Sequence, residues 1–154
     1  LMTSPVTALE MVAGKFVGAF LTYLAIWSFS LIYAVVIYFL GRPDIGPVIS
    51  AYAGIILVGA AFLSMGIFAS SLARTQLVAA IIAFVLLMAS FSVGITESIV
   101  QTDWIRETAG YLSVFHHFED FTSGIIDTRH VFYYLMITAV FLFLSVRFVE
   151  AGEQ

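Results

Sequence analysis

Cysteine is absent from this chain of 154 residues, and charged side chains make up only 10% of it. The missing cysteine excludes disulfide bonds and thiolate metal sites, and it leaves no sign of the redox compartment. The scarcity of charge accompanies a hydrophobic fraction of 62%, above the usual apolar share of a water-soluble domain. The formal net charge of −4 argues against a nucleic-acid partner, which needs a basic surface. The composition therefore predicts an integral membrane protein in contact with the lipid bilayer.

Proline is also rare, at three residues against eleven glycines. The apolar tracts are long and continuous, whereas a transmembrane barrel shows short segments of alternating hydrophobicity. We therefore expect an all-α integral membrane protein, a helix bundle. The chain begins at Leu1 without the charged segment and cleavage site of a signal peptide. We expect it to be a fragment of a longer polypeptide.

Charge is missing from residues 45–96 except at Arg74. Each half of this tract exceeds the roughly 20 apolar residues that cross about 30 Å of hydrocarbon. The two halves are therefore predicted to be spans that turn back at Arg74, Thr75 and Gln76. Residues 1–154 are expected to form a single transmembrane domain. Its four predicted spans cover residues 16–40, 48–73, 76–97 and 130–147.

The segments on either side of the first span carry cap and turn signals. Thr7 and Glu10 fit a capping box, in which the side chain of each residue bonds to the backbone of the other. Residues 1–15 should therefore hold an entry helix that begins near Ala8 and continues into the span. Residues 41–47 contain two prolines and two glycines, which predict a turn between the first and second spans.

Two pairs of small residues are spaced four apart in the predicted helices. They are Gly14 with Gly18, and Gly66 with Ser70. Such pairs let the backbone of another membrane helix approach closely, so they are candidate helix-packing positions. The alternative is a chance occurrence in a chain that is rich in glycine.

Four spans place both termini and the Arg74 turn on one side of the membrane. Residues 98–129, here called the outer loop, lie on the other side. Each side carries three basic residues, so the rule that cytoplasmic loops are positive does not orient the chain. Aromatic residues collect on the outer-loop side, as in a belt at a membrane interface. They are Tyr33, Tyr38, Tyr52, Trp104, Tyr133 and Tyr134.

The outer loop is expected to contain two short interfacial helices, over residues 103–107 and 112–121. In the second helix, apolar residues recur every three positions and make one apolar face. They are Leu112, Phe115, Phe118 and Phe121. Gly124 should end this helix, because glycine readily adopts the left-handed conformation found there.

His116, His117 and Asp120 lie in the same stretch and are open to two interpretations. His116 and Asp120 are four residues apart and share a helix face, so with His117 they could hold a metal ion. A tight metal site usually needs three or four converging ligands, and only His130 and Asp127 are otherwise near. The other interpretation is hydrogen bonding between imidazole and carboxylate at the headgroup boundary.

Charges near the last span predict a lid. Asp127 precedes the span, where a carboxylate caps free backbone N–H groups and meets the positive end of the helix dipole. Arg129 is predicted to pair with Glu119 or Asp120 in the preceding helix. Together with His117, these residues would hold the outer loop as a lid over a translocation path. The alternative is that the charges are solvated at the headgroups.

Several motifs together resemble one family. Residues 1–6, Glu10 and the run Gly14-Lys15-Phe16 are similar to the segment after the second span of type-2 ABC exporter permeases. Further stretches resemble the subfamily that includes gliding-motility and copper-enzyme-maturation permeases. They correspond to the middle turn, the outer loop and the last span of those permeases. These stretches are Phe68 to Leu72, Arg74 to Gln76, His117 to Phe121, Gly124 to Arg129, and Tyr133-Tyr134.

The resemblance implies that the chain holds spans three to six of a six-span permease. The side with the termini would then be cytoplasmic, in the inner membrane of a bacterium or archaeon. Such permeases work with a second permease copy or homologue and with two cytosolic ATPase subunits. This chain has no Walker lysine motif, so ATP and Mg²⁺ would bind to the ATPase, and no cofactor is expected here. The ATPase-coupling region would comprise Thr3, Ser4, Pro5, Glu10 and Lys15.

The sequence leaves three functions open. The first is the permease subunit of an ATP-driven ABC exporter, which forms the translocation path and is not itself an enzyme. The second is an intramembrane metal-dependent enzyme that uses His116, His117 and Asp120. The third is a membrane anchor subunit that transports nothing.

Overall fold

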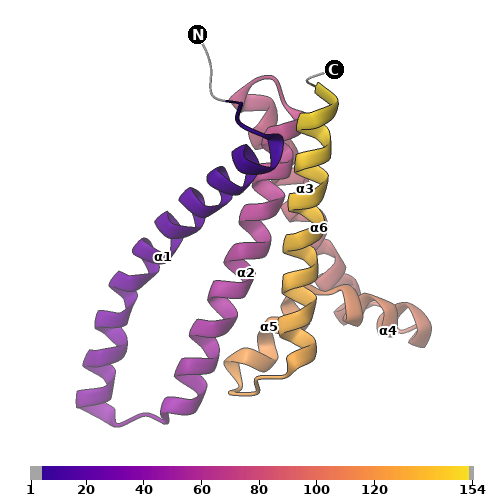
Figure 1. The fold of residues 1–154 in the computed structure, drawn as a ribbon. Helices are drawn as coiled ribbons and strands as arrows, with labels where there is room; N and C mark the ends of the chain where they lie inside the picture. The colour runs from indigo at the N-terminus through magenta and orange to yellow at the C-terminus, as the bar shows by residue number, and fades with distance from the viewer. Residues whose placement is uncertain (1–4, 153–154) are drawn as a thin grey trace.

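A computed structural model describes residues 5–152 of the chain, apart from the side chains of residues 97 and 98. The described residues form six α-helices and no strand (Figure 1). The helices are α1 (Ala8–Gly41), α2 (Ile45–Leu72), α3 (Gln76–Ile99), α4 (Asp103–Leu112), α5 (Val114–Thr122) and α6 (Thr128–Gly152).

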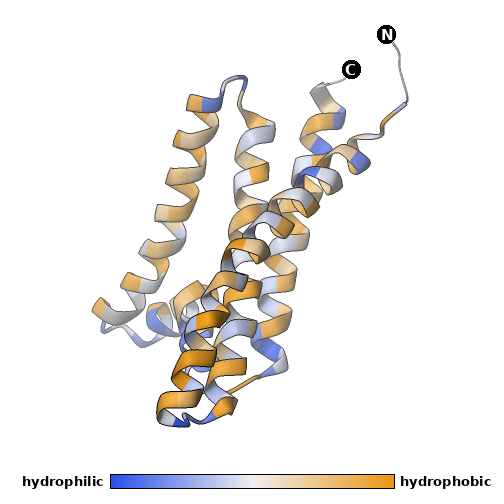
Figure 2. Ribbon diagram, turned by 90° about the vertical axis from the view of Figure 1, so that its left-hand side faces the viewer, coloured by the Kyte–Doolittle hydropathy of each residue, from blue (hydrophilic) through white to orange (hydrophobic). Residues whose placement is uncertain are grey.

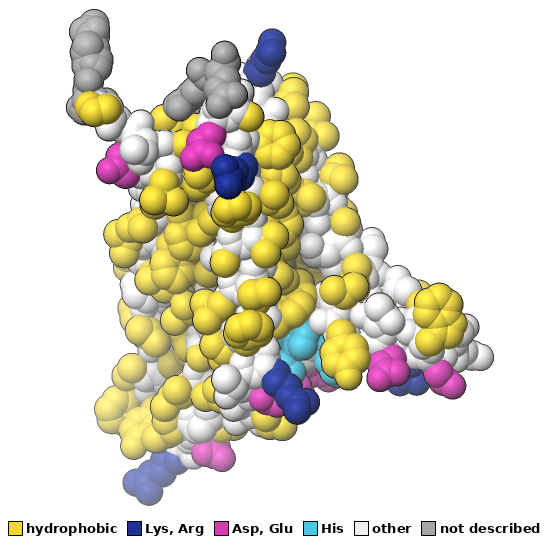
Figure 3. All heavy atoms as spheres, turned by 45° about the vertical axis from the view of Figure 1, so that its right-hand side comes forward, with side chains coloured by type: hydrophobic (Ala, Val, Ile, Leu, Met, Phe, Trp, Pro, Cys, Tyr) yellow, Lys and Arg dark blue, Asp and Glu magenta, His cyan; other side chains and the backbone are white. Residues whose placement is uncertain are grey.

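Four of these helices, α1, α2, α3 and α6, are long and apolar enough to cross a membrane. Hydrophobic residues follow the whole length of each, and hydrophilic residues gather at the turns and helix ends (Figure 2). A space-filling view shows a broad hydrophobic flank between charges at the two ends of the molecule (Figure 3). The predicted all-α membrane bundle with short loop helices is therefore confirmed, and the protein is a multi-pass membrane protein.

The two ends of the bundle carry different parts of the chain. The start of α1, the end of α6 and the turn between α2 and α3 lie together at one end, here called the terminal end (Figure 1). The turn between α1 and α2 lies at the opposite end with α4 and α5, and this is the loop end. The arrangement is the one that four antiparallel spans predict.

Helix α1 begins with the predicted capping box. The Thr7 backbone N–H donates to Oε2 of Glu10 at 2.9 Å, and the Glu10 N–H donates to Oγ1 of Thr7 at 3.3 Å. From there the helix continues without a break for 34 residues. At 1.5 Å per residue it is about 50 Å long, so it exceeds the hydrocarbon thickness and joins the two ends of the bundle.

The second span begins three residues earlier than predicted. Only Arg42 to Asp44 interrupt the helices, and α2 starts at Ile45 with Asp44 as its N-cap. The side chain of Asp44 accepts from the Gly46 N–H at 3.3 Å. Pro47 falls in the first turn, where its missing N–H has no helical partner to lose, so it does not end the helix.

The last span is longer than the predicted residues 130–147, because α6 covers Thr128–Gly152. The third also runs past its predicted end, to Ile99. Asp127 caps α6 as expected, since its Oδ1 accepts from the Arg129 N–H at 3.0 Å. Gly124 ends α5 at a φ of 85°, which confirms the left-handed glycine predicted there.

The predicted helix over residues 112–121 is wrong at its start. Leu112 ends α4, and α5 begins at Val114 after Ser113, whose Oγ accepts from the His116 N–H at 3.2 Å. The break removes Leu112 from the face of α5. The buried face consists of Val114, His117 and Phe121, because helical neighbours are three and four residues apart.

Helix α2 lies at the centre of the bundle and packs against α1, α3, α5 and α6. Glycines on α2 allow two of these contacts. A Cβ at Gly59 would lie 2.2 Å from the ring of Tyr23 in α1, and one at Gly54 would lie 2.8 Å from Cβ of Phe121 in α5. Gly54 and Gly59 are therefore small residues at which helices of this chain meet.

The small residues predicted for helix packing lie elsewhere. A Cβ at Gly14, Gly18 or Gly66 would have no heavy atom within 4 Å, and Ser70 is exposed. No helix of the described chain crosses at these positions. The predicted contact with another membrane helix at these positions is therefore not made within the described chain.

Candidate functional site

A cavity of about 560 Å³ opens at the loop end, between α4, α5 and the first turn of α6. The space-filling view shows histidine side chains in this hollow, beside the projecting α4 (Figure 3). The lining residues are Asp103, Arg106, Glu107, Gly110, Tyr111, His116, His117, Asp120, Asp127, Arg129 and His130. The predicted lid residues His117, Asp120, Asp127 and Arg129 are among them, but the exposed Glu119 is not.

Two consecutive tyrosines of α6 hold the junction between α4 and α5. The hydroxyl group of Tyr133 donates to the carbonyl oxygen of Leu112, and that of Tyr134 donates to the carbonyl oxygen of Val114, both at 2.5 Å. Tyr134 is fully buried. These bonds fix the start of α5 against α6, although the two segments are about twenty residues apart in sequence.

The turn after α5 brings the start of α6 back to the same place. The Gly124 N–H donates to the carbonyl oxygen of Phe121 at 3.2 Å, and the Ile125 N–H donates to that of Asp120 at 3.0 Å. This pair of bonds is the Schellman arrangement, which reverses the chain at a helix end. As a result, His130 in the first turn of α6 faces the buried side of α5.

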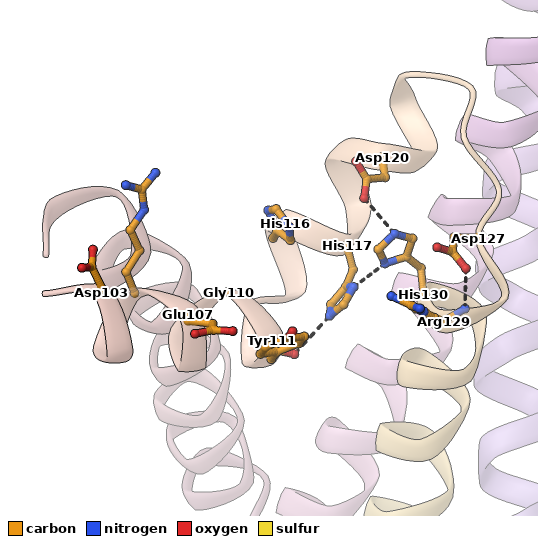
Figure 4. Close-up of a pocket in the computed structure, with 11 residues that line it drawn as sticks. Asp103, Glu107, Gly110, Tyr111, His116, His117, Asp120, Asp127, Arg129 and His130 are labelled. Carbon is orange, nitrogen blue, oxygen red and sulfur yellow. Dashed lines mark hydrogen bonds and ion pairs between the residues drawn. The ribbon is translucent and has the colours of Figure 1, made fainter. Parts of the chain in front are cut away.

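The central feature of the cavity is a row of hydrogen bonds (Figure 4). Oδ2 of Asp120 lies 2.7 Å from Nε2 of His130. Nδ1 of His130 is hydrogen-bonded to Nδ1 of His117. Nε2 of His117 lies 3.1 Å from the carbonyl oxygen of Tyr111. We call the side chains of Asp120, His130 and His117, with the Tyr111 carbonyl, the histidine relay.

Burial sets the electrostatics of the relay. Both imidazoles are mostly shielded, with exposed fractions of 8% for His117 and 9% for His130. Burial lowers the pKa of His117, because a charged imidazole is poorly solvated there. The nearby His130 and His116 lower this pKa further, whereas the Tyr111 carbonyl and the Asp120 carboxylate raise it. Burial is the largest of these effects, so it favours a neutral His117.

The predicted pairing of Arg129 with Glu119 or Asp120 is wrong. Asp120 pairs with His130, and within the described part of the chain Arg129 makes no side-chain ion pair. Arg129 instead contributes its backbone N–H, which donates to the side chain of Asp127 in the cap of α6. Neighbouring residues on a helix differ in direction by about 100°, so His130 faces α5 while Arg129 does not.

The role of His130 is the one that sequence reasoning missed. The sequence suggests this residue only as a nearby additional ligand for a metal ion, although His130 supplies the central member of the relay. The signal available in the sequence was a polar residue three positions after the N-cap Asp127 and one turn away from Tyr133-Tyr134. Only the turn at Gly124 shows that this position meets His117.

The residues of the metal-enzyme interpretation do not converge on one point. Among the described residues, no group of three or more histidines and acids is placed to hold a metal ion. His116 is exposed, and its ring centroid lies 6.1 Å from that of His117, outside the hydrogen-bonded pair of His117 and His130 (Figure 4). Asp120 contacts Nε2 of His130, the nitrogen that faces away from His117.

The other predicted functional residues lie at the terminal end. Pro5, Glu10 and Lys15 are exposed at the start of α1. Arg74, Thr75 and Gln76 form the turn before α3, and Oγ1 of Thr75 accepts from the Val78 N–H at 3.4 Å. Thr3 and Ser4 lie outside the described residues. Of the predicted coupling positions, Pro5, Glu10 and Lys15 are therefore at the opposite end of the bundle from the histidine relay.

Comparison of the chain with protein-family models, with curated proteins and with solved structures finds no match. The class that the fold defines is a multi-pass α-helical membrane protein with a polar cavity at one end.

Proposed function

We propose that the chain is the membrane-spanning permease subunit of an ATP-driven ABC exporter. It would form part of the translocation path and would be coupled to a separate cytosolic ATPase. The observation that carries the proposal is the unbroken α1, which joins the capped segment around Glu10 to the loop end. A continuous helix transmits a displacement at one end to the other, because it moves as a rigid element.

The distribution of apolar surface supports a larger assembly. The apolar windows of α1 and α3 contain no fully buried residue, so this chain leaves much of the surface of both helices uncovered. In a membrane, such surfaces are covered by lipid or by helices of other chains. We therefore propose a second permease copy or homologue as a partner, with the bilayer around it.

The proposed mechanism is alternating access. ATP and Mg²⁺ bind to the partner ATPase, whose closure pushes residues 3–15 and tilts α1 against α2. The path would then open at the loop end. This coupling requires the ATPase to bind the two states of the permease with different affinity. The terminal end is cytoplasmic in this proposal, and the membrane is the inner membrane of a bacterium or archaeon.

Site-directed crosslinking tests the coupling. The complete polypeptide, free of other cysteines, is purified in mild detergent as Lys15→Cys and as Ser123→Cys, and each is treated with a thiol–amine crosslinker. We expect Lys15→Cys to crosslink to a co-purified subunit that hydrolyses ATP, because Lys15 is exposed at the terminal end. Ser123→Cys, exposed at the loop end, is the matched control and should give no such product. Purification without any ATPase, or equal crosslinking at both positions, would contradict the proposal.

A further inference from the structure

The histidine relay must hold a defined number of protons. It contains three hydrogen bonds, and each needs one proton. The Tyr111 carbonyl can only accept, so its bond fixes a proton on Nε2 of His117. The bond between the two Nδ1 atoms needs a second proton, and the bond between His130 and Asp120 needs a third.

Two neutral imidazoles bring only two protons. The third resides either on His130, which then donates from both nitrogens to His117 and to an ionised Asp120, or on the Asp120 carboxyl group. The relay has no net charge in either arrangement. Because burial favours a neutral His117, the first arrangement has the positive charge on His130, and the Asp120 carboxylate at 2.7 Å balances it.

We propose that His117, His130 and Asp120 form a binding site for one labile proton, and that this proton holds α5 against the first turn of α6. The proposal does not rest on the transport function, because it concerns a contact within this chain. It assigns a ligand to the cavity at the loop end, and the ligand is a proton.

The contact between α5 and α6 breaks if the relay loses one of its three protons or gains a fourth. With two protons and an ionised Asp120, both Nε2 atoms carry hydrogen, and two lone pairs face each other between the Nδ1 atoms. With four protons, two N–H groups face each other instead. Only the three-proton state makes all three bonds, so proton binding and the packing of α5 on α6 are linked.

The linkage gives an optimum rather than a one-way switch. When α5 separates from α6, both imidazoles enter water, where an imidazole ordinarily changes charge at about pH 6.5. In the closed state, in which α5 packs on α6, the relay holds three protons. Above that pH the released relay holds only two, so closing takes up a proton and acid favours the closed state. Below that pH the released relay holds four, so closing releases a proton and acid disfavours the closed state. The closed-to-open ratio is therefore highest near pH 6.5 and falls by up to about tenfold per pH unit on either side.

Other charged groups face the relay from the elements packed around it. α4 contributes Asp103, Arg106 and Glu107, α5 contributes His116, and the segment that starts α6 contributes Asp127 and Arg129. The phenol rings of Tyr133 and Tyr134 also contact His117. α2 has no charged residue, and the Glu97 side chain of α3 is outside the described part. Of these groups, only the imidazole of His116 is of a type that ordinarily changes charge between pH 5 and 8.

A bridging metal ion is the competing occupant. Imidazoles that bind metals usually donate their other N–H to a carbonyl or carboxylate, as both relay histidines do here. A zinc ion needs about 2.0–2.1 Å to each nitrogen, however, and tetrahedral geometry then separates the two nitrogens by about 3.3 Å, which is farther apart than the two Nδ1 atoms are here. The direct bond between the Nδ1 atoms favours the proton.

The experiment measures how often α5 leaves α6. Val114→Cys places a thiol on the buried face of α5, where the side chain is 4% exposed. In the complete polypeptide, in nanodiscs and free of other cysteines, its rate of reaction with a thiol reagent is measured from pH 5 to pH 8. Division by the rate of exposed Ser123→Cys removes the pH dependence of the thiol itself. We expect the relative rate to be lowest near pH 6.5 and to rise up to about tenfold per pH unit on both sides.

Three further variants in the Val114→Cys background make the result specific. His116→Gln removes an imidazole next to the relay and should keep the minimum. His130→Gln leaves His117 as the only imidazole of the relay, so the relative rate should lose its minimum and rise only toward acid, because burial disfavours a charged His117. His117→Phe should also abolish the minimum, while its ring preserves the packing on Tyr133, which lies 4.0 Å from His117 between centroids. A flat or one-directional profile in the parent, or an unchanged minimum in both relay variants, would overturn the proposal.

Metal content separates the two occupants. The pH profile is repeated after treatment with a chelator and again after addition of zinc. We expect the same minimum in both, because the ligand is a proton. A minimum that disappears with the chelator and returns with zinc would replace the proton by a metal ion.

Discussion

The ring of Tyr23 in α1 lies directly against the backbone of Gly59 in α2. Its hydroxyl group donates a hydrogen bond of 2.8 Å to the carbonyl oxygen of Ile55, one turn before the glycine. This contact fixes α1 to α2 at the centre of the bundle. Between Tyr23 and the loop end, the residues of α1 are largely exposed. A hydrogen at position 59 is what allows the ring to reach that carbonyl.

The first prediction is that Gly59→Ala weakens the bundle. The new Cβ would lie 2.2 Å from the Tyr23 ring, so the ring or the helices must move. Overpacking of this kind costs about 1–3 kcal/mol, which should lower the thermal midpoint in detergent. Gly66→Ala is the matched control, because nothing lies within 4 Å of its Cβ position. Equal midpoints for the two variants would show that α1 does not pack as described.

The second prediction concerns the buried hydroxyl group of Tyr134. Tyr134→Phe leaves the carbonyl oxygen of Val114 without its partner in a buried place, which costs about 1–3 kcal/mol. We expect a lower thermal midpoint and faster hydrogen exchange at the start of α5. Tyr133→Phe is the control, since the carbonyl of the exposed Leu112 can bond to water instead. A larger effect from Tyr133→Phe than from Tyr134→Phe would argue against this packing.

The third prediction tests the orientation of the bundle in the membrane. The chain has no cysteine, so a single introduced thiol is the only one in this segment. A membrane-impermeant reagent should label Ser123→Cys in intact cells, but label Thr75→Cys only after the membrane is opened. The two positions lie at opposite ends of the bundle. The reverse labelling pattern would place the terminal end outside the cell.

The fourth prediction concerns a helix from another chain. Gly18 has open space at its Cβ position, so Gly18→Leu is tolerated within this chain. If a second permease copy crosses α1 there, the added side chain should block the approach of its backbone and reduce assembly. Light scattering in mild detergent measures the mass of the assembly. An unchanged mass and unchanged stability would show that this face of α1 meets lipid.

Local patterns in the sequence were sufficient for the spans and their ends. The uncharged tracts on both sides of Arg74 predict two helices and a tight turn, because each tract is long enough to cross the hydrocarbon core. The capping box at Thr7 and the cap at Asp127 were also predictable, since both depend on residues within one helical turn. The side of the membrane on which each end lies remains a prediction.

The packing positions could not be predicted in this way. Gly14 and Gly59 are equally small, and only the crossing of α1 over α2 shows that Gly59 meets a ring while Gly14 does not. The apolar face of α5 was misplaced for a related reason. The break at Ser113 separates Leu112 from the helix, and a period of three had seemed to join them.

The amino-acid sequence by itself determined the class of this protein, the number of its membrane helices and the polar composition of its loop end, because hydrophobicity and capping are local properties. Only the tertiary structure decided that Asp120 pairs with His130 rather than with Arg129, and that His117 completes the row. That choice depends on the left-handed turn at Gly124 and on the tyrosine bonds to the start of α5, which set which side of each helix faces the other.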